Sequence, residues 1–306
     1  MSRRSDQITT RGADLIPLQA HVTHALDQVP QVHGTPCFLN VRGEPSPALR
    51  GAVLGYSGFI EVHAHTVARI ALPTPHVKLS FSFGSVLRVV SSKQVASYRS
   101  FVARPSAEPV QLEHGGFRHR VNAVLTPLGA CRVLGLRLGE LPEYVSIEDA
   151  LGPFAHEATE QLAGAATWRE RFQILDRLLE QRLARPSKLD GDVGARALLR
   201  LEQTDGTLAI RDLARELGCT RKHVHERVAA VGGVCPKLYA SLLRFHRVVH
   251  AMRATTPTTV AEIARDSGYY DPSHLHRDVR RFSGTSPREL WRDLAGTVPG
   301  RFVEPI

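Results

Sequence analysis

The sequence predicts an α+β chain in two parts: a β-rich N-terminal barrel or sandwich with added helices, and an all-helical C-terminal domain. Short runs of alternating polarity dominate residues 51–138, a 3.6-residue apolar period follows Pro142, and a repeat of about 50 residues lies beyond a break at 184–194. The 306 residues suffice for two domains. We expect domains at 1–185 and 196–306, joined by a linker at 186–195.

The β-rich part is clearest from Ile60, where apolar residues alternate with a polar face that carries Glu61, His63, His65 and Arg69. This pattern predicts one long strand, straight or bent midway. Further short apolar or alternating runs, separated by Pro and Gly, are KLSFSFG, VLRVV, SYRSFVA, PVQLEH, RHRVNAVLTP and CRVLGLRL. Their spacing suits a cupin-like barrel or a sandwich.

An amphipathic helix is predicted from Thr167 to Leu183. Thr167 and Glu170 form the sequence of a capping box, and large apolar side chains recur from Trp168 onward at helical spacing. This apolar stripe either packs on its own domain or forms a dimer interface, and the sequence leaves both open.

Composition narrows the function classes. No apolar run reaches the roughly 18 to 20 residues of a membrane span, and the first residues lack a secretory h-region, so we expect a cytoplasmic, nucleoid-associated protein with no membrane partner. A net charge of +9 favours a polyanionic partner. The cysteines form no close pair, which argues against a zinc finger, an iron–sulfur site or a disulfide scaffold: Cys37, Cys131, Cys219 and Cys235.

The C-terminal part repeats itself. The segment that begins at Ile210 aligns with the one that begins at Val260, at an offset of 50 residues that becomes 51 after the turn. Each copy has an apolar residue and an alanine, then a glycine suited to a left-handed turn, then a second helix with an apolar pair at i and i+4. The pattern predicts two helix-turn-helix motifs, at about 206–232 and 257–283.

The second helix of each motif is predicted to expose its first two turns. Thr220 is the expected N-cap of the first such helix, and Asp271 with Pro272 that of the second. A helix that exposes polar residues there suits the major groove of DNA, where side chains meet base edges. The predicted DNA-binding residues of these helices are Thr220, Arg221, Lys222, His225, Glu226, Ser273, His274, His276, Arg277 and Arg280.

A basic stretch lies between the motifs. From Cys219 to Arg253 there are seven Lys or Arg residues against one acid. The segment after Lys237 alternates apolar and basic residues, which predicts one rigid helix whose wet side carries Arg244 and Arg247 as further DNA contacts.

The second copy, together with the repeat and the connecting helix, resembles the DNA-binding domain of the AraC/XylS family of bacterial transcription regulators over about residues 196–294. The residues that carry this resemblance are Ile263, Ala264, Gly268, Tyr269, Ser273, His274, Leu275, Arg277, Phe282, Gly284, Ser286 and Pro287. It implies two recognition helices in successive major grooves of one DNA face. Runs such as VNAVLTPLGACRVLGL and FSFG are similar to other family members and imply a β-rich regulatory domain followed by helices that can dimerise.

Three features of the N-terminal part invite other interpretations. His63 and His65 share a strand face and could bind a metal with Glu61, but Arg69 stands where a further ligand would be needed. Ser57 lacks the second glycine of a nucleophile elbow at the required spacing. The stretch 114–119 suits a glycine hairpin with solvated ends, or the rim of a ligand site.

The sequence therefore predicts a sequence-specific DNA-binding transcription regulator, modulated through its N-terminal domain, with no catalytic residues, metal or cofactor. Double-stranded DNA is the predicted partner. RNA polymerase, a small-molecule effector and a second copy of the chain remain open. The alternative is a metal-dependent cupin-like enzyme fused to a DNA-binding module.

Overall fold

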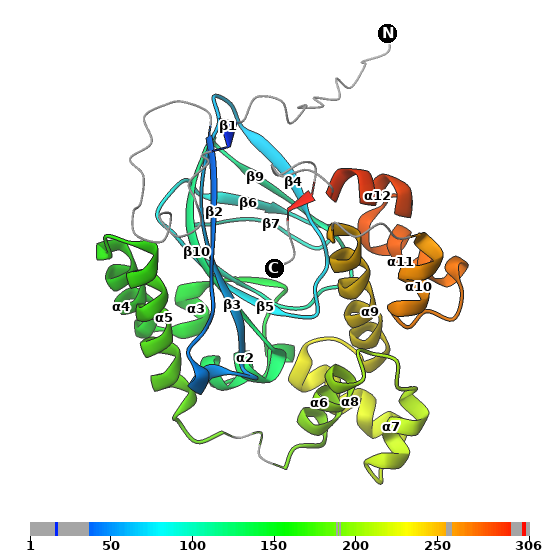
Figure 1. Cartoon of the computed structure of the whole chain (residues 1–306). Coiled ribbons are helices and arrows are strands. Elements are labelled where there is room, and N and C mark those ends of the chain that lie inside the picture. Colours follow the sequence, from blue (N-terminus) through cyan, green and yellow to red (C-terminus); the bar gives the residue numbers. More distant parts are fainter. Residues whose placement is uncertain are drawn as a thin grey trace.

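The computed structural model describes residues 16–17, 37–187, 189, 191–254, 259–294 and 302–303. Figure 1 shows a β-rich N-terminal part built from two sheets and a column of helices beside it, which confirms the predicted fold class. The sandwich is flanked by helices on both sides: α3–α5 lie against one side, and the C-terminal helices line the other.

Two sheets form the sandwich. The larger one has the spatial order β1 (Ile16–Pro17), β2 (Cys37–Gly43), β3 (Val53–Val62), β10 (Phe117–Leu125), β5 (Val77–Ser82), β8 (Phe101–Ala103) and β11 (Tyr144–Ser146). The smaller one has the order β12 (Phe302–Val303), β4 (Val67–Ala71), β9 (Val110–His114), β6 (Leu87–Val90) and β7 (Val95–Tyr98). The central strand β10 pairs antiparallel with both β3 and β5.

The long strand predicted from Ile60 is divided. It leaves the larger sheet at Val62 and enters the smaller sheet at Val67, so the bend is a change of sheet. The predicted glycine hairpin at 114–119 is likewise a crossing from β9 in one sheet to β10 in the other. The expectation of solvated ends is wrong, because His114 and Arg118 are buried.

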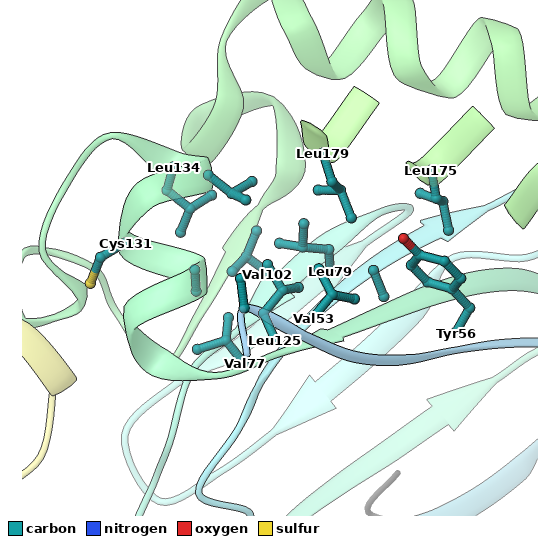
Figure 2. Close-up of a cluster of buried hydrophobic side chains, with 14 of the residues drawn as sticks. Val53, Tyr56, Val77, Leu79, Val102, Leu125, Cys131, Leu134, Leu175 and Leu179 are labelled. Atoms are coloured by element: carbon teal, nitrogen blue, oxygen red, sulfur yellow. The ribbon is translucent and has the colours of Figure 1, made fainter. Parts of the chain in front are cut away.

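Among the described residues before α5, five helical segments follow the strands or interrupt them: η1 (Pro47–Leu49), α2 (Pro127–Leu134), η2 (Leu138–Glu140), α3 (Ile147–Leu151) and α4 (Pro153–Gly164). The predicted amphipathic helix is α5 (Trp168–Leu183), and the Thr167 side chain accepts a hydrogen bond from the Glu170 amide as expected. Figure 2 shows Leu175 and Leu179 directed towards Tyr56 and Leu79 of the larger sheet. The apolar stripe is thus covered by its own domain.

The described residues of the C-terminal part, 193–254 and 259–294, form seven helices: α6 (Val193–Gln203), α7 (Ile210–Glu216), α8 (Arg221–Gly232), α9 (Pro236–Arg253), α10 (Val260–Asp266), α11 (Pro272–Ser283) and α12 (Pro287–Leu294). The predicted linker at 186–195 overlaps the segment between α5 and α6, but its last three residues belong to α6, whose first turn is capped by Asp192. In the part of the chain that the structure describes, no single helix is long and apolar enough to cross a membrane. Of these described helices, only the bent pair of α8 and α9, with 59° between them, would together have the length and composition of a membrane span.

The apolar side chains gather in different cores. The first motif shares a core with the larger sheet and its helices, through residues such as Val228 and Val231 beside Val133. The second motif packs with α9 in a separate core, which Leu72, just after β4, also joins. The N-terminal part therefore contacts both motifs, each through a different element.

Candidate nucleic-acid interface

The two motifs repeat each other bond for bond at their turns. Gly218 and Gly268 both take the left-handed conformation, with φ of 65° and 76°. In the first motif the Cys219 amide donates to the Ala214 carbonyl at 3.0 Å, and in the second the Tyr269 amide donates to the Ala264 carbonyl at 2.9 Å. The repeat in the sequence is therefore a repeat of helix–turn–helix geometry.

The second helix of each motif begins at the predicted cap. The Thr220 hydroxyl accepts from the His223 amide at 3.2 Å, and the Asp271 carboxylate accepts from the His274 amide at 2.7 Å. Pro272 occupies the first turn of α11, where its missing amide proton costs nothing. Both helices thus start at a fixed residue, which fixes the side chains that occupy their first two turns.

Packing decides which way those side chains face. The apolar pairs Val224 with Val228 and Leu275 with Val279 are completely buried. The opposite faces are open to solvent, and they carry nine of the ten helix residues predicted to bind DNA: Thr220, Arg221, Lys222, His225, Glu226, Ser273, His276, Arg277 and Arg280. Contact of these residues with DNA stays a prediction, but their exposure is what such contact requires.

His274 behaves differently from the other predicted residues. Its ring is half-buried and meets the Tyr269 ring edge-on, with 5.1 Å between the ring centroids. The same contact orders the turn immediately before α11. A role in holding this turn therefore explains the position of His274 without a base contact.

The connecting helix α9 departs from the expected wet basic side. Arg244 is half-buried; its guanidinium donates to the Gly206 carbonyl and to the Ser241 hydroxyl, and lies 5.5 Å from the centre of the Tyr269 ring. It joins the start of the first motif to the turn of the second. The expectation that Arg244 points into solvent is wrong, because the fold offers it a carbonyl that lies 38 residues away in sequence.

Arg247 makes a parallel connection. Its guanidinium donates to the carboxylate of Asp205, in the loop just before the first motif, and to the carbonyl of Asp266 in the second motif. Arg227, another member of the basic stretch, turns back to the buried carboxylate of Asp192. The cations left on the exposed surface of α8 and the start of α9 are Arg221, Lys222 and Lys237.

A surface hollow lies beside the first recognition helix. Its lining combines the start of α7, the cap and first two turns of α8, and the start of α9, through Ile210, Thr220, Arg221, Lys222, His225, Glu226, Pro236 and Lys237. The amino-terminal ends of two helices meet there with three basic side chains. Free amide protons and the positive ends of helix dipoles favour a phosphate at such a place.

Sequence reasoning missed one exposed residue. Tyr270 is 95% exposed and directly precedes the cap of α11. It is the residue at which the repeat offset grows from 50 to 51, so the insertion in the alignment was the available signal. A large exposed ring at the tip of a motif is a candidate contact to the sugar–phosphate backbone.

The residues that suggested other chemistry are engaged elsewhere. The Glu61 carboxylate contacts His63 at 2.7 Å and also pairs with Arg69 and Arg118. Burial raises the pKa of Glu61, but the hydrogen bond with His63 and the charges of Arg118 and Arg69 outweigh burial and hold the pKa well below its ordinary value. Among the described residues, no group of three or more His, Cys, Asp or Glu side chains could hold a metal ion.

Ser57 also lacks the geometry of a nucleophile. It lies inside the straight pairing of β3 with β10, where its hydroxyl accepts from the Asn122 amide at 3.1 Å. A nucleophile elbow requires a sharp turn from strand to helix. This strand position excludes that motif.

Comparison with known proteins agrees with the C-terminal geometry. Residues 213–293 match the model of a helix-turn-helix domain family. No curated protein matches the chain. This match confirms the helix-turn-helix domain that the repeat predicts.

Three solved structures with a similar course of the chain are distant from it in sequence. ToxT from Vibrio cholerae is 13% identical, with a TM-score of 0.47, and the match covers 85% of this chain and 99% of that chain. A regulator with an AraC-type DNA-binding domain from Chromobacterium violaceum is 20% identical, with a TM-score of 0.32, and the match covers 35% of this chain and 96% of that chain. A probable AraC family regulator from Rhodopseudomonas palustris is 21% identical, with a TM-score of 0.29, and the match covers 33% of this chain and 99% of that chain. The C-terminal assignment rests on the matched domain and its geometry, not on these low scores.

Proposed function

We propose that the chain is a DNA-binding transcription regulator of the AraC type. Its helix-turn-helix domain, matched over residues 213–293, reads a site by placing α8 and α11 in successive major grooves on one face of the double helix. The observation that carries the proposal is the bond-for-bond repetition of turn and cap, with buried apolar pairs behind two exposed polar faces. Two copies of one geometry suit a DNA surface that repeats about every 34 Å.

The first recognition helix supplies both base and phosphate contacts. Arg221 and Lys222 suit guanine, and Glu226 suits the exocyclic amine of cytosine. The Lys222 ammonium lies 3.9 Å from the Glu226 carboxylate, but both side chains are exposed, so this pair is weak and yields to DNA. Lys237 and the hollow at the starts of α8 and α9 take a phosphate.

The second recognition helix offers a more basic surface. Ser273, His276, Arg277 and Arg280 face solvent on the first two and a half turns of α11. Arg277 and Arg280 are suited to guanine or to phosphate, whereas Ser273 and His276 tolerate several bases. We place Tyr270 against the backbone at the edge of this groove.

Arg244 and Arg247 fix the distance between the two recognition helices in this proposal. Each connects the loop that begins the first motif to the second motif, across the rigid helix α9. Because the two helices are held as one unit, the spacing of their half-sites in DNA must be fixed as well.

The N-terminal domain modulates this unit through direct contacts. Arg104 donates to the Gly233 carbonyl at 2.9 Å, at the end of α8. Gly139 of η2 lies so close to α8 that a Cβ there would be 2.7 Å from the Ala229 carbonyl oxygen. A change in the N-terminal domain would therefore alter DNA affinity, with a coupling of about 1–3 kcal/mol typical of such systems.

Binding-site selection with the full chain tests the proposal. We expect an asymmetric site of two half-sites about 10–10.5 base pairs apart. Five base pairs inserted between them turn the second half-site to the opposite face, so affinity should fall at least tenfold. A spacer with changed sequence but unchanged length is the control and should bind normally. If both spacers bind alike, the paired-groove arrangement is refuted.

We further propose that the chain has no catalytic step of its own, works in the cytoplasm at the nucleoid, and acts through RNA polymerase. The other partners that we propose are a second copy of the chain and a small-molecule effector. Reconstituted transcription with polymerase, with and without the protein, measures the effect directly.

A further inference from the structure

One buried carboxylate at the end of the linker holds three parts of the chain together. The Asp192 side chain is 4% exposed. Its Oδ1 accepts from the amides of Gly194 at 2.7 Å and Ala195 at 3.4 Å, in the first turn of α6. Its Oδ2 accepts from Arg137, between α2 and η2 of the N-terminal domain, at 3.2 Å, and also from Arg227 of α8. The same side chain therefore joins the N-terminal domain, the linker and the first recognition helix.

The two guanidinium groups depend on each other because they share one carboxylate oxygen. The side chains of Arg137 and Arg227 are 35% and 32% exposed, whereas the carboxylate between them is shielded from water. A shielded ionised group depends more strongly on its remaining partner when the other partner is lost. A displacement of Arg137 therefore changes the force that Asp192 exerts on Arg227.

The backbone around Asp192 is closely packed. The helices α6 and α8 lie side by side (Figure 1), and a Cβ on Gly194 would lie 2.4 Å from the Arg227 carbonyl oxygen. On the side of the N-terminal domain, the Cys131 thiol donates to the Val231 carbonyl at 3.2 Å. Such close contacts leave α8 little freedom to slide, so a changed pull on Arg227 mainly turns the helix about its axis.

The equivalent position in the second motif is connected differently. The repeat places Asp278 of α11 where α8 has Arg227. Asp278 is buried and lies near Tyr269 of its own motif, because burial and then the charge of Asp278 raise the pKa of Tyr269 above its ordinary value. The charge on α11 thus acts within the second motif, whereas the charge on α8 is paired outside the first motif.

We propose that Asp192 is a positioning residue for the first recognition helix. Through Arg227 it sets the rotation of α8 about its axis, and through Arg137 it makes this rotation depend on the N-terminal domain. The inference rests on the proposed placement of α8 in a major groove, and names a route for its regulation. Neighbouring residues of a helix are about 100° apart around its axis, so a turn driven at Arg227 also carries the exposed Glu226 away from its base edge.

The affinity of the full chain for three DNAs tests this role: the selected site, the site with its first half scrambled, and the site with its second half scrambled. D192N keeps an oxygen that can accept from the amides of α6, but it removes the negative charge. We expect D192N to weaken binding about tenfold wherever the first half-site is intact, and not at all where it is scrambled. An equal loss on all three DNAs would make Asp192 a helix cap alone and overturn the inference.

Arg137 provides a second test, outside the cap of α6 and outside the first motif. R137Q should weaken binding several-fold, again only where the first half-site is intact, and R137K should restore the affinity because it keeps a charged donor. The matched control R200Q breaks the exposed pair of Arg200 with Glu216 and should bind like the unaltered protein. If D192N fails to fold, a folded R137Q protein with unchanged affinity still overturns the inference.

A combination of variants separates this inference from the proposed arrangement on DNA. R137Q should add nothing to the loss of affinity in R227Q, because its effect passes through Arg227. If spacer-dependent binding persists but the two losses multiply, only the role of Asp192 is wrong. If binding does not depend on spacer length, while R137Q alone weakens it and adds nothing to R227Q, Asp192 keeps its role and the paired-groove arrangement falls.

Discussion

Arg244→Ala distinguishes a clamp between the motifs from a contact to DNA. The substitution removes a charged hydrogen bond to the Gly206 carbonyl, which is worth about 1.5–3 kcal/mol. It also removes the cation stacked 5.5 Å from the centre of the Tyr269 ring, worth about 0.5–1 kcal/mol at a partly exposed site. We expect the free energy of unfolding of the C-terminal helices to fall by about 2–3 kcal/mol.

Urea denaturation and a salt titration of DNA binding measure the two roles separately. Each phosphate contact adds about 0.9 to the slope of log affinity against log salt. R244A should leave this slope unchanged, because its guanidinium is already engaged with protein groups. The control K237A removes an exposed cation at the start of α9, so its slope should fall by about 0.9 with no change in stability. An R244A protein of normal stability with a reduced slope would refute this reasoning.

The remaining predictions concern a base contact, the turns and pH. R221A should lose about 1–3 kcal/mol of discrimination at positions in the first half-site only, as site selection would show; uniform weakening over all sequences would contradict a base contact. G218A should lower the free energy of unfolding by about 1 kcal/mol, because Gly218 has a positive φ but open space around it. G268A should lower it by about 2 kcal/mol or more, because Gly268 also has a positive φ and a Cβ there would lie 2.4 Å from the Thr207 side chain. Equal losses of stability in urea denaturation would show that this clash is absent. Burial, followed by the charges of His246 and His250, lowers the pKa of His76 to about 3, so the unfolded chain binds the extra proton between about pH 6.5 and 3. Stability should therefore fall as pH decreases through this window, and H76F should reduce the slope by about 1.4 kcal/mol per pH unit; an unchanged slope in H76F would exclude His76.

The features that sequence reasoning predicted are those set by near neighbours. The caps at Thr220 and Asp271 bond amides three residues away, and the left-handed glycines close their turns within a few residues. The apolar pairs on α8 and α11 follow helical spacing. Each of these depends on a short window of sequence, so the pattern contains all the information required.

The features that it missed depend on distant partners. Nothing near Arg244 in the sequence indicates that the Gly206 carbonyl accepts its hydrogen bond, or that Asp192 draws Arg227 away from the exposed surface. The alternation from Ile60 identified Glu61 and Arg69 as one polar face, but not that they lie in two different sheets. Long basic side chains reach partners across the fold, so helical periodicity alone did not reveal the positions of Arg244 and Arg227.

The two attachments of the N-terminal domain determine what a signal from it can do. The first recognition helix is held by Arg104, which directly follows β8 of the larger sheet, and the second rests on Ile70 and Leu72, at the end of β4 in the smaller sheet. A change in the separation of the two sheets would move the two supports relative to each other, not together. DNA fixes the spacing of its grooves, so after even a small relative shift of α8 and α11 only one of the two helices would contact its groove fully. Such a shift would give a coupling of about 1–3 kcal/mol without a large domain motion.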